Sequence, residues 1–304
     1  MREAGKARQA GRVTASFGRR HEVRVEDGGL LACVRRGRLQ DVACGDEVEI
    51  TVTAEGEGVI EAVGARSSLL YRSDAFRQKV LAANLDLAVV VVSGKPYFRE
   101  TLLTRCLAAA GAAGMDSLIV CNKQELPETQ LALSELAYYQ SINVEVLALS
   151  AKQDVTPLTE RLRNHDSILV GESGMGKSTL INALLPGALA RTGELSSAAD
   201  SGRHTTTSAR RFDLPGGGSV VDSPGMQVFG LQHLDRTSLE QAFAEFRPLA
   251  GTCRFADCEH GDEPGCALKA AASRNPRTAQ RLAWLREILE ENRRVAHWER
   301  KSFT

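Results

Sequence analysis

Residues 171–178 have the sequence Gly171-Glu172-Ser173-Gly174-Met175-Gly176-Lys177-Ser178, which matches the whole phosphate-loop pattern G-x-x-x-x-G-K-[ST]. The apolar run from Ser167 to Val170 precedes this loop and has the length of a buried strand, and Thr179 to Leu185 can continue the chain as a helix. A strand, a complete glycine-rich loop and a helix in this order predict a P-loop nucleotide-binding domain.

Each part of this loop has a predicted role. The glycines let backbone N–H groups turn inward around phosphate oxygens, and the N-terminus of the following helix adds a positive dipole. Lys177 is expected to reach the β- and γ-phosphates, and the Ser178 hydroxyl to coordinate Mg²⁺. We therefore expect every residue from Gly171 to Thr179 to contact the nucleotide, although the loop alone does not choose between ATP and GTP.

The candidate base-recognition segment is Asn122-Lys123-Gln124-Glu125, which follows a predicted strand from Ser117 to Cys121. It resembles the N-K-x-D motif with which GTPases recognise guanine. There the carboxylate accepts hydrogen bonds from guanine N1–H and the exocyclic amine, and it rejects adenine, which has a bare acceptor on that edge. Glu125 keeps the carboxylate but places it one methylene farther out than Asp, so a P-loop ATPase or kinase remains an alternative.

A second base loop, Ser150-Ala151-Lys152, follows the predicted strand Val144 to Leu149 and resembles the S-A-K loop whose backbone contacts the guanine oxygen. A predicted helix from Glu128 to Gln140 separates the two base loops, as a β-α-β step requires. The residues expected to bind the base are Asn122, Lys123, Glu125, Ser150 and Ala151.

Further residues that we expect to hold Mg²⁺ follow the P-loop in the sequence. Asp222-Ser223-Pro224-Gly225 follows a predicted strand, Ser219 to Val221, and resembles the D-x-x-G motif. Asp222 is expected to hold Mg²⁺ through water, and the Gly225 N–H to sense the γ-phosphate. Between these motifs lies Gly202-Arg203-His204-Thr205-Thr206-Thr207, where a switch I threonine would complete the Mg²⁺ shell. Thr206 is the first choice for this role and Thr205 the second.

The order of the motifs is rotated relative to ordinary GTPases, which begin with the P-loop and end with the base loops. Such a circular permutation need not disturb the site, because ligands of open α/β sheets bind beyond the carboxyl ends of strands wherever those strands lie in the sequence. It requires only that the original termini lie near each other. The sequence therefore predicts a circularly permuted GTPase domain.

Catalytic residues are harder to assign. Met226 follows the D-x-x-G motif, where many GTPases have a glutamine that orients the attacking water. A thioether cannot polarise water, so His204 is the candidate for a hydrogen-bonding or general-base residue. The alternative is that His204 is only a surface residue of switch I. In either case we expect slow intrinsic turnover and acceleration by a partner. The predicted catalytic residues are His204, Lys177 and Thr206.

The N-terminal segment has a different sequence pattern. Residues from about Gly11 to Gly64 contain five short Val-rich stretches separated by turns, which predicts a small barrel of the OB type, a frequent nucleic-acid platform. Any other small β-module is the alternative. The stretches are Arg12–Phe17, Glu22–Val25, Leu30–Arg35, Glu47–Val52 and Gly58–Val63. The polar composition of Ser67 to Lys79 favours a connector.

The C-terminal segment combines helical patterns with a cysteine cluster, Cys253, Cys258, His260 and Cys266, spaced C-x₄-C-x-H-x₅-C. Three thiolates and an imidazole fill a tetrahedral shell and leave no open position, so the pattern predicts one structural Zn²⁺. The alternative is a chance cluster in a reduced protein. The helical patterns cover Arg236–Phe246, Ala267–Ser273 and Pro276–Trp298. Cysteines expected to be buried are Cys33, Cys44, Cys106 and Cys121.

Composition sets limits on the class of protein. The chain has 304 residues, with 38 Lys+Arg and 38 Asp+Glu, so its net charge gives no indication of an anionic partner. The N-terminus lacks the apolar core of a signal peptide, and no apolar run reaches the roughly 18 residues of a membrane span. The odd number of cysteines, 7, favours a reducing cytoplasm. We expect a cytoplasmic monomer with no membrane partner.

Together these segments resemble the ribosome small-subunit-dependent GTPase A family, RsgA/YjeQ. The resemblance covers nearly the whole chain and includes Ala82-Ala83-Asn84-Leu85-Asp86 before the first strand of the central domain, residues 202–207 and the zinc pattern. It implies a GTPase that acts late in maturation of the small ribosomal subunit, is stimulated by that subunit, and contacts its 16S rRNA through the OB and zinc domains. It also implies a catalytic role for His204.

The predicted fold is multi-domain: an OB-fold RNA-binding domain at 1–66, a circularly permuted α/β P-loop GTPase domain at 67–230, and a mainly helical zinc-binding domain at 231–304. A competing interpretation is an RNA-binding module that binds GTP only as a conformational ligand, without significant turnover.

Overall fold

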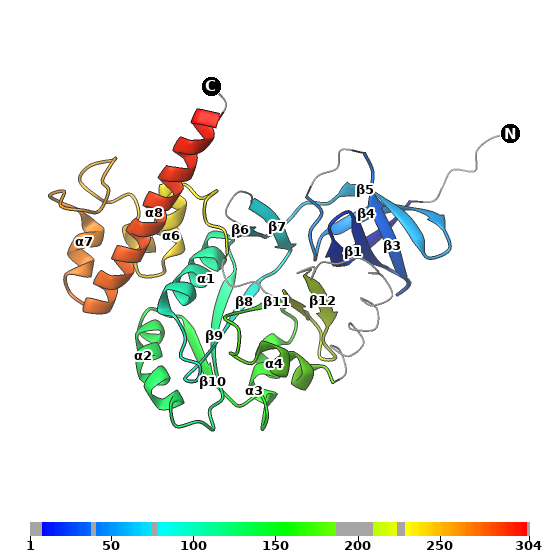
Figure 1. The fold of residues 1–304 in the computed structure, drawn as a ribbon, viewed down its shortest axis with the longest axis horizontal. Helices are drawn as coiled ribbons and strands as arrows, with labels where there is room; N and C mark the ends of the chain where they lie inside the picture. The colour runs from blue at the N-terminus through cyan, green and yellow to red at the C-terminus, as the bar shows by residue number, and fades with distance from the viewer. Residues whose placement is uncertain (1–7, 38–40, 74–77, 187–208, 224–228, 303–304) are drawn as a thin grey trace.

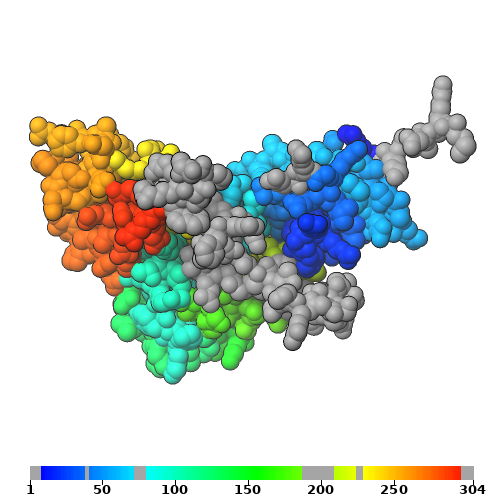
Figure 2. Space-filling view, turned by 45° about the horizontal axis from the view of Figure 1, so that its top comes forward, coloured from blue at the N-terminus to red at the C-terminus, as the bar shows by residue number. Residues whose placement is uncertain are grey.

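The computed structural model describes residues 8–37, 41–73, 78–186, 209–223 and 229–302. In chain order they form a barrel, a central α/β domain and a helical module (Figure 1). The barrel and the helical module lie at opposite ends of the molecule, with the central domain between them (Figure 2). This arrangement confirms the predicted fold class.

Among the helices of the described residues, none combines the length and apolar character of a membrane span.

The N-terminal strands close into a five-stranded barrel, which confirms the five predicted strands. Their bounds are β1 Arg8–Phe17, β2 Arg20–Val25, β3 Leu30–Arg35, β4 Glu47–Ala54 and β5 Glu57–Val63. The order β1-β2-β3-β5-β4, closed by pairing of β4 with β1, is a Greek key in which only β3 and β5 are parallel. Inward-facing side chains such as Val13, Ile50 and Ile60 fill the barrel.

A β-hairpin connects the barrel to the central domain. It consists of β6 (Leu69–Ser73) paired antiparallel with β7 (Gln78–Ala83), so the prediction of a polar connector from Ser67 to Lys79 was wrong. Leu70 and Leu81 are 2% and 7% exposed and pack into the core of the central domain. The apolar side chains on the two strands outweigh the polar composition of the segment as a whole.

A parallel sheet forms the centre of the molecule. Its strands, in spatial order, are β10 (Glu145–Ala148), β9 (Asp116–Asn122), β8 (Leu87–Ser93), β11 (Asp166–Val170) and β13 (Ser219–Asp222). Every residue of β8 is buried, because helices cover both faces of the sheet. Figure 1 shows α1 (Glu100–Ala112) and α2 (Thr129–Ser141) on one face, and α3 (Thr156–Leu162) and α4 (Lys177–Leu184) on the other.

The chain order reverses between β8 and β11. From β8 the chain adds β9 and β10 on one side, and it then returns to place β11 and β13 on the other. Ligands of open α/β sheets bind beyond the carboxyl ends of strands at such a reversal. Ser93 and Asn122 are register partners at that edge, and Leu169 of β11 is paired with Asp222. The sheet therefore brings the predicted loops to a common edge.

The strand that joins the central sheet to the barrel was not predicted. β12 (Arg210–Asp213) runs antiparallel to β13 and extends the sheet to the barrel, where Arg210 pairs with Ala15 of β1. Its sequence, Arg-Arg-Phe-Asp, contains no apolar run, so the strand depends on pairing with its neighbours rather than on local propensity. The barrel and the central sheet thereby form one continuous eleven-stranded sheet.

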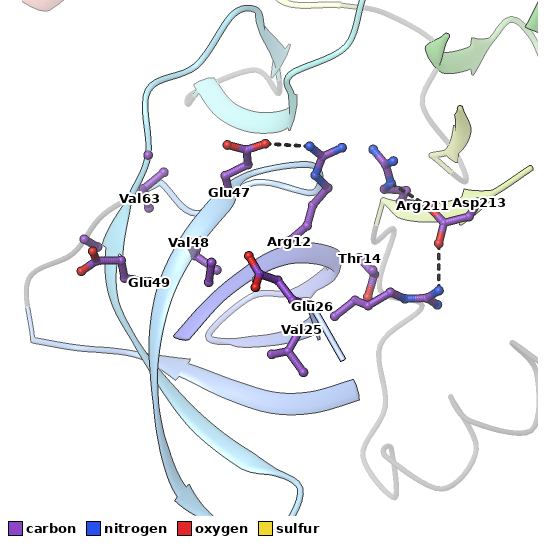
Figure 3. Close-up of a pocket in the computed structure, with 15 residues that line it drawn as sticks. Arg12, Thr14, Val25, Glu26, Glu47, Val48, Glu49, Val63, Arg211 and Asp213 are labelled. Atoms are coloured by element: carbon purple, nitrogen blue, oxygen red, sulfur yellow. Dashed lines mark hydrogen bonds and ion pairs between the residues drawn. The ribbon is translucent and has the colours of Figure 1, made fainter. Parts of the chain in front are cut away.

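Ion pairs reinforce the junction between barrel and central domain. Asp166, at the start of β11, lies 3.1 Å from the guanidinium of Arg12 in the barrel and 3.0 Å from that of Arg211 in β12. Arg24 of the barrel lies 2.8 Å from Asp213 of β12. Figure 3 shows Arg12, Arg211 and Asp213 beside a cavity of about 740 Å³ between the two domains. Charged contacts therefore hold the barrel to the strands that lead to the P-loop and to Asp222.

The C-terminal module docks on α1 of the central domain. Its helices are α6 (Arg236–Ala242), the 3₁₀ helix η1 (Arg247–Leu249), α7 (Ala267–Ala272) and α8 (Pro276–Ser302). Helix α6 approaches α1 so closely that a Cβ at Gly111 would lie 2.6 Å from the carbonyl oxygen of Ala242. Arg281 of α8 is buried, pairs with Glu245, and donates to the Thr104 hydroxyl of α1 at 3.0 Å. The module is thus packed on the central domain by both backbone and buried polar contacts.

Candidate functional site

The phosphate loop lies between β11 and α4, as predicted. Gly171 has a φ of +143°, and a Cβ there would lie 2.3 Å from the carbonyl oxygen of Val91. Gly176, immediately before α4, has a φ of +95°, and its Cβ would lie 2.3 Å from Nδ2 of Asn122. Both positions therefore require glycine. Because glycine has no side chain, the backbone of the loop can also approach a ligand closely at these positions.

Lys177 is the first residue of α4 and folds back over the loop. Its Nζ donates to the carbonyl oxygens of Gly171 at 2.6 Å and of Glu172 at 2.7 Å. Burial lowers the pKa of Lys177 and raises the pKa of Asp222, while the attraction between the two groups opposes both shifts. A cation and a carboxylate thus share one poorly solvated region, and a phosphate chain with Mg²⁺ would supply the opposite charge to each.

Asn122 joins the three predicted loops. Its Nδ2 donates to the carbonyl oxygen of Met175 in the P-loop at 2.9 Å, and its Oδ1 accepts from the backbone N–H of Ala151 in the S-A-K loop at 3.0 Å. Asn122 is 2% exposed, so water does not compete for these hydrogen bonds. One buried amide therefore fixes the positions of the base loops relative to the phosphate loop.

Lys123 adds a second link that was not predicted. Its backbone has a φ of +66°, and its Nζ donates to the carbonyl oxygens of Gly174 and Lys95, both at 2.6 Å. Lys95 belongs to the loop after β8, which sequence reasoning missed. The available signal was the Gly94-Lys95-Pro96 turn at the carboxyl end of a buried strand, next to the reversal of strand order.

A cavity of about 320 Å³ opens between these loops. Glu125 is exposed at its rim, and the nearby Ser150 hydroxyl lowers the pKa of the Glu125 carboxyl. Ser150 Oγ itself is buried. An ionised acceptor and a buried hydroxyl thus lie together where a base would enter. The lining residues are Lys95, Asn122, Lys123, Glu125, Leu126, Ala151, Lys152, Gly176 and Thr179.

The remaining predicted nucleotide residues fall into two groups. Ser173 of the P-loop is exposed, as are Ser178 and Thr179 in the first turn of α4. Glu172 instead has a protein partner, because its carboxylate accepts a hydrogen bond from the backbone N–H of Arg99 at 2.8 Å. The other predicted residues lie outside the described residues. They are His204, Thr205 and Thr206 of switch I, and Gly225 and Met226.

The cysteine cluster is assembled in the C-terminal module. The ligand atoms of Cys253, Cys258, His260 and Cys266 all lie within 4.8 Å of one another, and the sulfurs of Cys253 and Cys266 are 4.0 Å apart. A tetrahedral ion with Zn–S bonds of about 2.3 Å separates its sulfurs by about 3.8 Å. The donor set and its spacing therefore fit a four-coordinate metal.

The predicted burial of Cys33, Cys44, Cys106 and Cys121 is confirmed.

A carboxylate beside this cluster was missed. Glu240 of α6 is 2% exposed, and its Oε1 lies 2.9 Å from Nε2 of His260. Because the two residues are 20 positions apart and lie on different elements, no local sequence pattern connects them.

The comparisons with known proteins agree with this geometry. A family model described as RsgA GTPase matches residues 63–232, more than half of the chain. The Small ribosomal subunit biogenesis GTPase RsgA of Neisseria meningitidis serogroup B is 46% identical over 279 residues, which are 92% of this chain and 91% of that protein. The chain belongs to the RsgA GTPase family. The protein with the same name in Nitrosomonas europaea is 44% identical over 292 residues, 95% of this chain and 93% of that protein.

Solved structures extend the family resemblance to the whole architecture. The crystal structure of YjeQ from Thermotoga maritima superposes with a TM-score of 0.71 at 28% identity, and the match covers 93% of this chain and 99% of that one. YloQ, described as a circularly permuted GTPase, superposes with a TM-score of 0.68 over 96% of this chain and 98% of that one. Its identity is 22%, so this likeness concerns the fold alone. Membership of the RsgA GTPase family confirms the predicted permuted GTPase.

Removal of the Lys177 side chain tests the phosphate site of this family member. We expect Lys177→Ala to weaken binding of a non-hydrolysable GTP analogue by roughly ten- to hundredfold, because a charge-assisted hydrogen bond contributes about 1.5–3 kcal/mol. Titration calorimetry measures the change, and Lys269→Ala, which removes a half-exposed surface lysine, is the control. Equal affinity of Lys177→Ala and the control would place the phosphates elsewhere.

Proposed function

We propose that this chain hydrolyses GTP to GDP and phosphate on the small ribosomal subunit and assists a late step of that subunit's maturation. The relatives named small ribosomal subunit biogenesis GTPase support this setting. The observation that carries the proposal is that three loops, distant in the sequence, meet around one cavity with the amide of Asn122 between them.

In this proposal the nucleotide lies along the carboxyl edge of the sheet. Backbone N–H groups from Gly171 to Thr179 bind the phosphates, and Lys177 leaves its carbonyl partners for the β- and γ-phosphate oxygens. Glu125 accepts hydrogen bonds from the guanine edge. The walls of the base cavity are Asn122, Lys123, Ser150 and Ala151.

Mg²⁺ would be held by Ser178, Asp222 and Thr206, with the Gly225 N–H near the γ-phosphate. The ion would neutralise charge on the phosphate oxygens. Burial raises the pKa of Asp222 although Lys177 attracts the carboxylate, and a divalent cation beside Asp222 would add positive charge that stabilises its ionised form.

His204 is proposed to orient or deprotonate the attacking water, since Met226 cannot. If His204 reaches its catalytic position only on the ribosome, this would account for the proposed stimulation of hydrolysis by the subunit. Lys177 and Thr206 would stabilise the charge that develops on the transferred phosphoryl group.

The cluster of Cys253, Cys258, His260 and Cys266 is proposed to bind one Zn²⁺. Three thiolates favour zinc over hard cations such as Mg²⁺, and four protein ligands leave no position for substrate, so the role would be structural.

The barrel and the metal module are proposed to contact 16S rRNA from either end of the GTPase domain. We propose functional units at 1–66, 67–230 and 231–304, acting as a cytoplasmic monomer. The separation of the barrel and the module in Figures 1 and 2 supports simultaneous contact with two sites on a large partner.

A hydrolysis assay with GTP and ATP, with and without purified small ribosomal subunits, tests the proposed function. We expect slow GTP hydrolysis alone, strong stimulation by subunits, and little ATP hydrolysis. His204→Ala should keep GTP binding but reduce stimulated turnover by about 10²–10⁴-fold, the usual contribution of a general base. His165→Ala removes a histidine at the opposite, amino-terminal edge of the sheet and should leave turnover unchanged.

Two results of this assay would reject the proposal. If subunits do not stimulate hydrolysis, the ribosomal setting is wrong. If GTP binds but is never turned over, even with subunits, the chain is a GTP-regulated RNA-binding module instead.

Metal analysis tests the zinc assignment. We expect one Zn²⁺ per chain in the wild type, and substoichiometric zinc in Cys258→Ser with loss of hydrogen-exchange protection over residues 251–266, because the ion is expected to hold this loop together. Cys33→Ala, which removes a buried thiol of the barrel, should retain the full zinc content. Undiminished zinc in Cys258→Ser would exclude Cys258 as a ligand.

A further inference from the structure

The two ring nitrogens of His260 face different groups. Its Nδ1 lies 3.4 Å from the sulfur of Cys266 and 3.7 Å from those of Cys253 and Cys258, so this nitrogen faces the cluster. Its Nε2 faces away and lies 2.9 Å from Oε1 of Glu240. A neutral imidazole carries one donor and one acceptor nitrogen, and a carboxylate can only accept. Nε2 must therefore carry the proton, which leaves the Nδ1 lone pair directed at the sulfurs.

Glu240 is itself held in one position. Arg236, one helical turn earlier, donates to the same Oε1 at 2.7 Å, and the backbone N–H of Gly251 lies 3.4 Å from Oε2. The side chains of Glu240 and His260 are 2% and 0% exposed. A carboxylate with these partners cannot rotate away without leaving its own charge unpaired and the buried Nε2–H of His260 unsatisfied.

We propose that Glu240 is a positioning residue of the metal site, which fixes the tautomer and orientation of His260 so that Nδ1 binds the ion. This inference rests on the proposed zinc site. A carboxylate that accepts from the non-ligating N–H of a metal-bound histidine raises the basicity of the ring and removes the cost of selecting its tautomer.

The same contact ties the metal loop to the GTPase domain. Glu240 belongs to α6, and two residues later the backbone of Ala242 packs against Gly111 of α1. His260 has a φ of +60°, so the backbone at this ligand also departs from the usual regions for residues other than glycine. Metal binding and Glu240 together therefore hold a short loop in a single conformation against a helix that is docked on the central domain.

Zinc affinity of the full-length protein tests the proposal. Competition with a chromophoric chelator should show zinc binding weakened about 10- to 100-fold in Glu240→Gln, and further in Glu240→Ala, which removes the acceptor altogether. Glu290→Gln removes a half-exposed carboxylate of α8 and should keep wild-type affinity. Unchanged affinity in Glu240→Gln, with one zinc bound, would overturn the role of Glu240 while leaving the zinc site intact.

A double-mutant cycle separates positioning of His260 from general support of the module. In a His260→Cys background the ligand is a thiolate with no second nitrogen to orient. Glu240→Gln should then change zinc affinity within about twofold, the scatter of independent sites. An equal loss in both backgrounds would mean that Glu240 acts on the scaffold and not through His260.

The visible spectrum of the Co²⁺-substituted protein gives a readout that a purely structural role would not move. We expect the ligand-field bands to shift in Glu240→Gln and to stay unchanged in Glu290→Gln, because only the former alters the donor strength of a ligand. A lower melting temperature with an unchanged cobalt spectrum would contradict the proposal. If Glu240→Ala fails to fold, the zinc affinity and the cobalt spectrum of Glu240→Gln test the proposal. Absence of zinc from the wild type would instead reject the metal site, and neither result bears on GTP hydrolysis.

Discussion

The side-chain amide of Asn122 holds the nucleotide site together. It donates to the P-loop at Met175 and accepts from the S-A-K loop at Ala151, so three segments from separate parts of the chain share one side chain. Each hydrogen bond contributes only about 0.5–1.5 kcal/mol, but a buried partner left without one costs more, so the loops are held in one arrangement. Gly176 is part of this constraint, because any Cβ there would displace the amide. The permuted chain order is compatible with this site because the constraint is spatial and not sequential.

The two outer domains are attached to elements that border the site. The barrel continues the central sheet through β12 and is paired through Arg12 with Asp166, at the start of the strand that leads into the P-loop. Asp166 also accepts from Ser219 at the start of β13, which ends at Asp222. At the other end, α6 packs on α1 and places Glu240 beside His260 of the cysteine–histidine cluster. The barrel therefore contacts the strands that lead to the nucleotide loops. The C-terminal module contacts α1, a helix of the same central domain.

The sequence was sufficient wherever chemistry fixes the spacing of residues along the chain. Local signals exist for the P-loop glycines, for the cluster of three cysteines and a histidine, and for the alternation of the barrel strands. The features it could not predict depend on partners far away in the sequence. Strand β12 exists because β13 and β1 pair with it, and the β6–β7 hairpin because its leucines enter a core formed later in the chain. Lys95 and Glu240 reach their sites only through the reversal of strand order and the docking of α6, respectively.

The affinity of Asn122→Ala for GDP tests the assembly of the three loops most directly. Because the amide connects the loops without carrying the phosphates, we expect GDP binding, measured by titration calorimetry, to weaken at least about tenfold while the protein stays folded. Gln140→Ala, which removes an exposed amide at the far end of α2, is the control and should bind GDP like the wild type. Wild-type affinity in a folded Asn122→Ala variant would contradict the account.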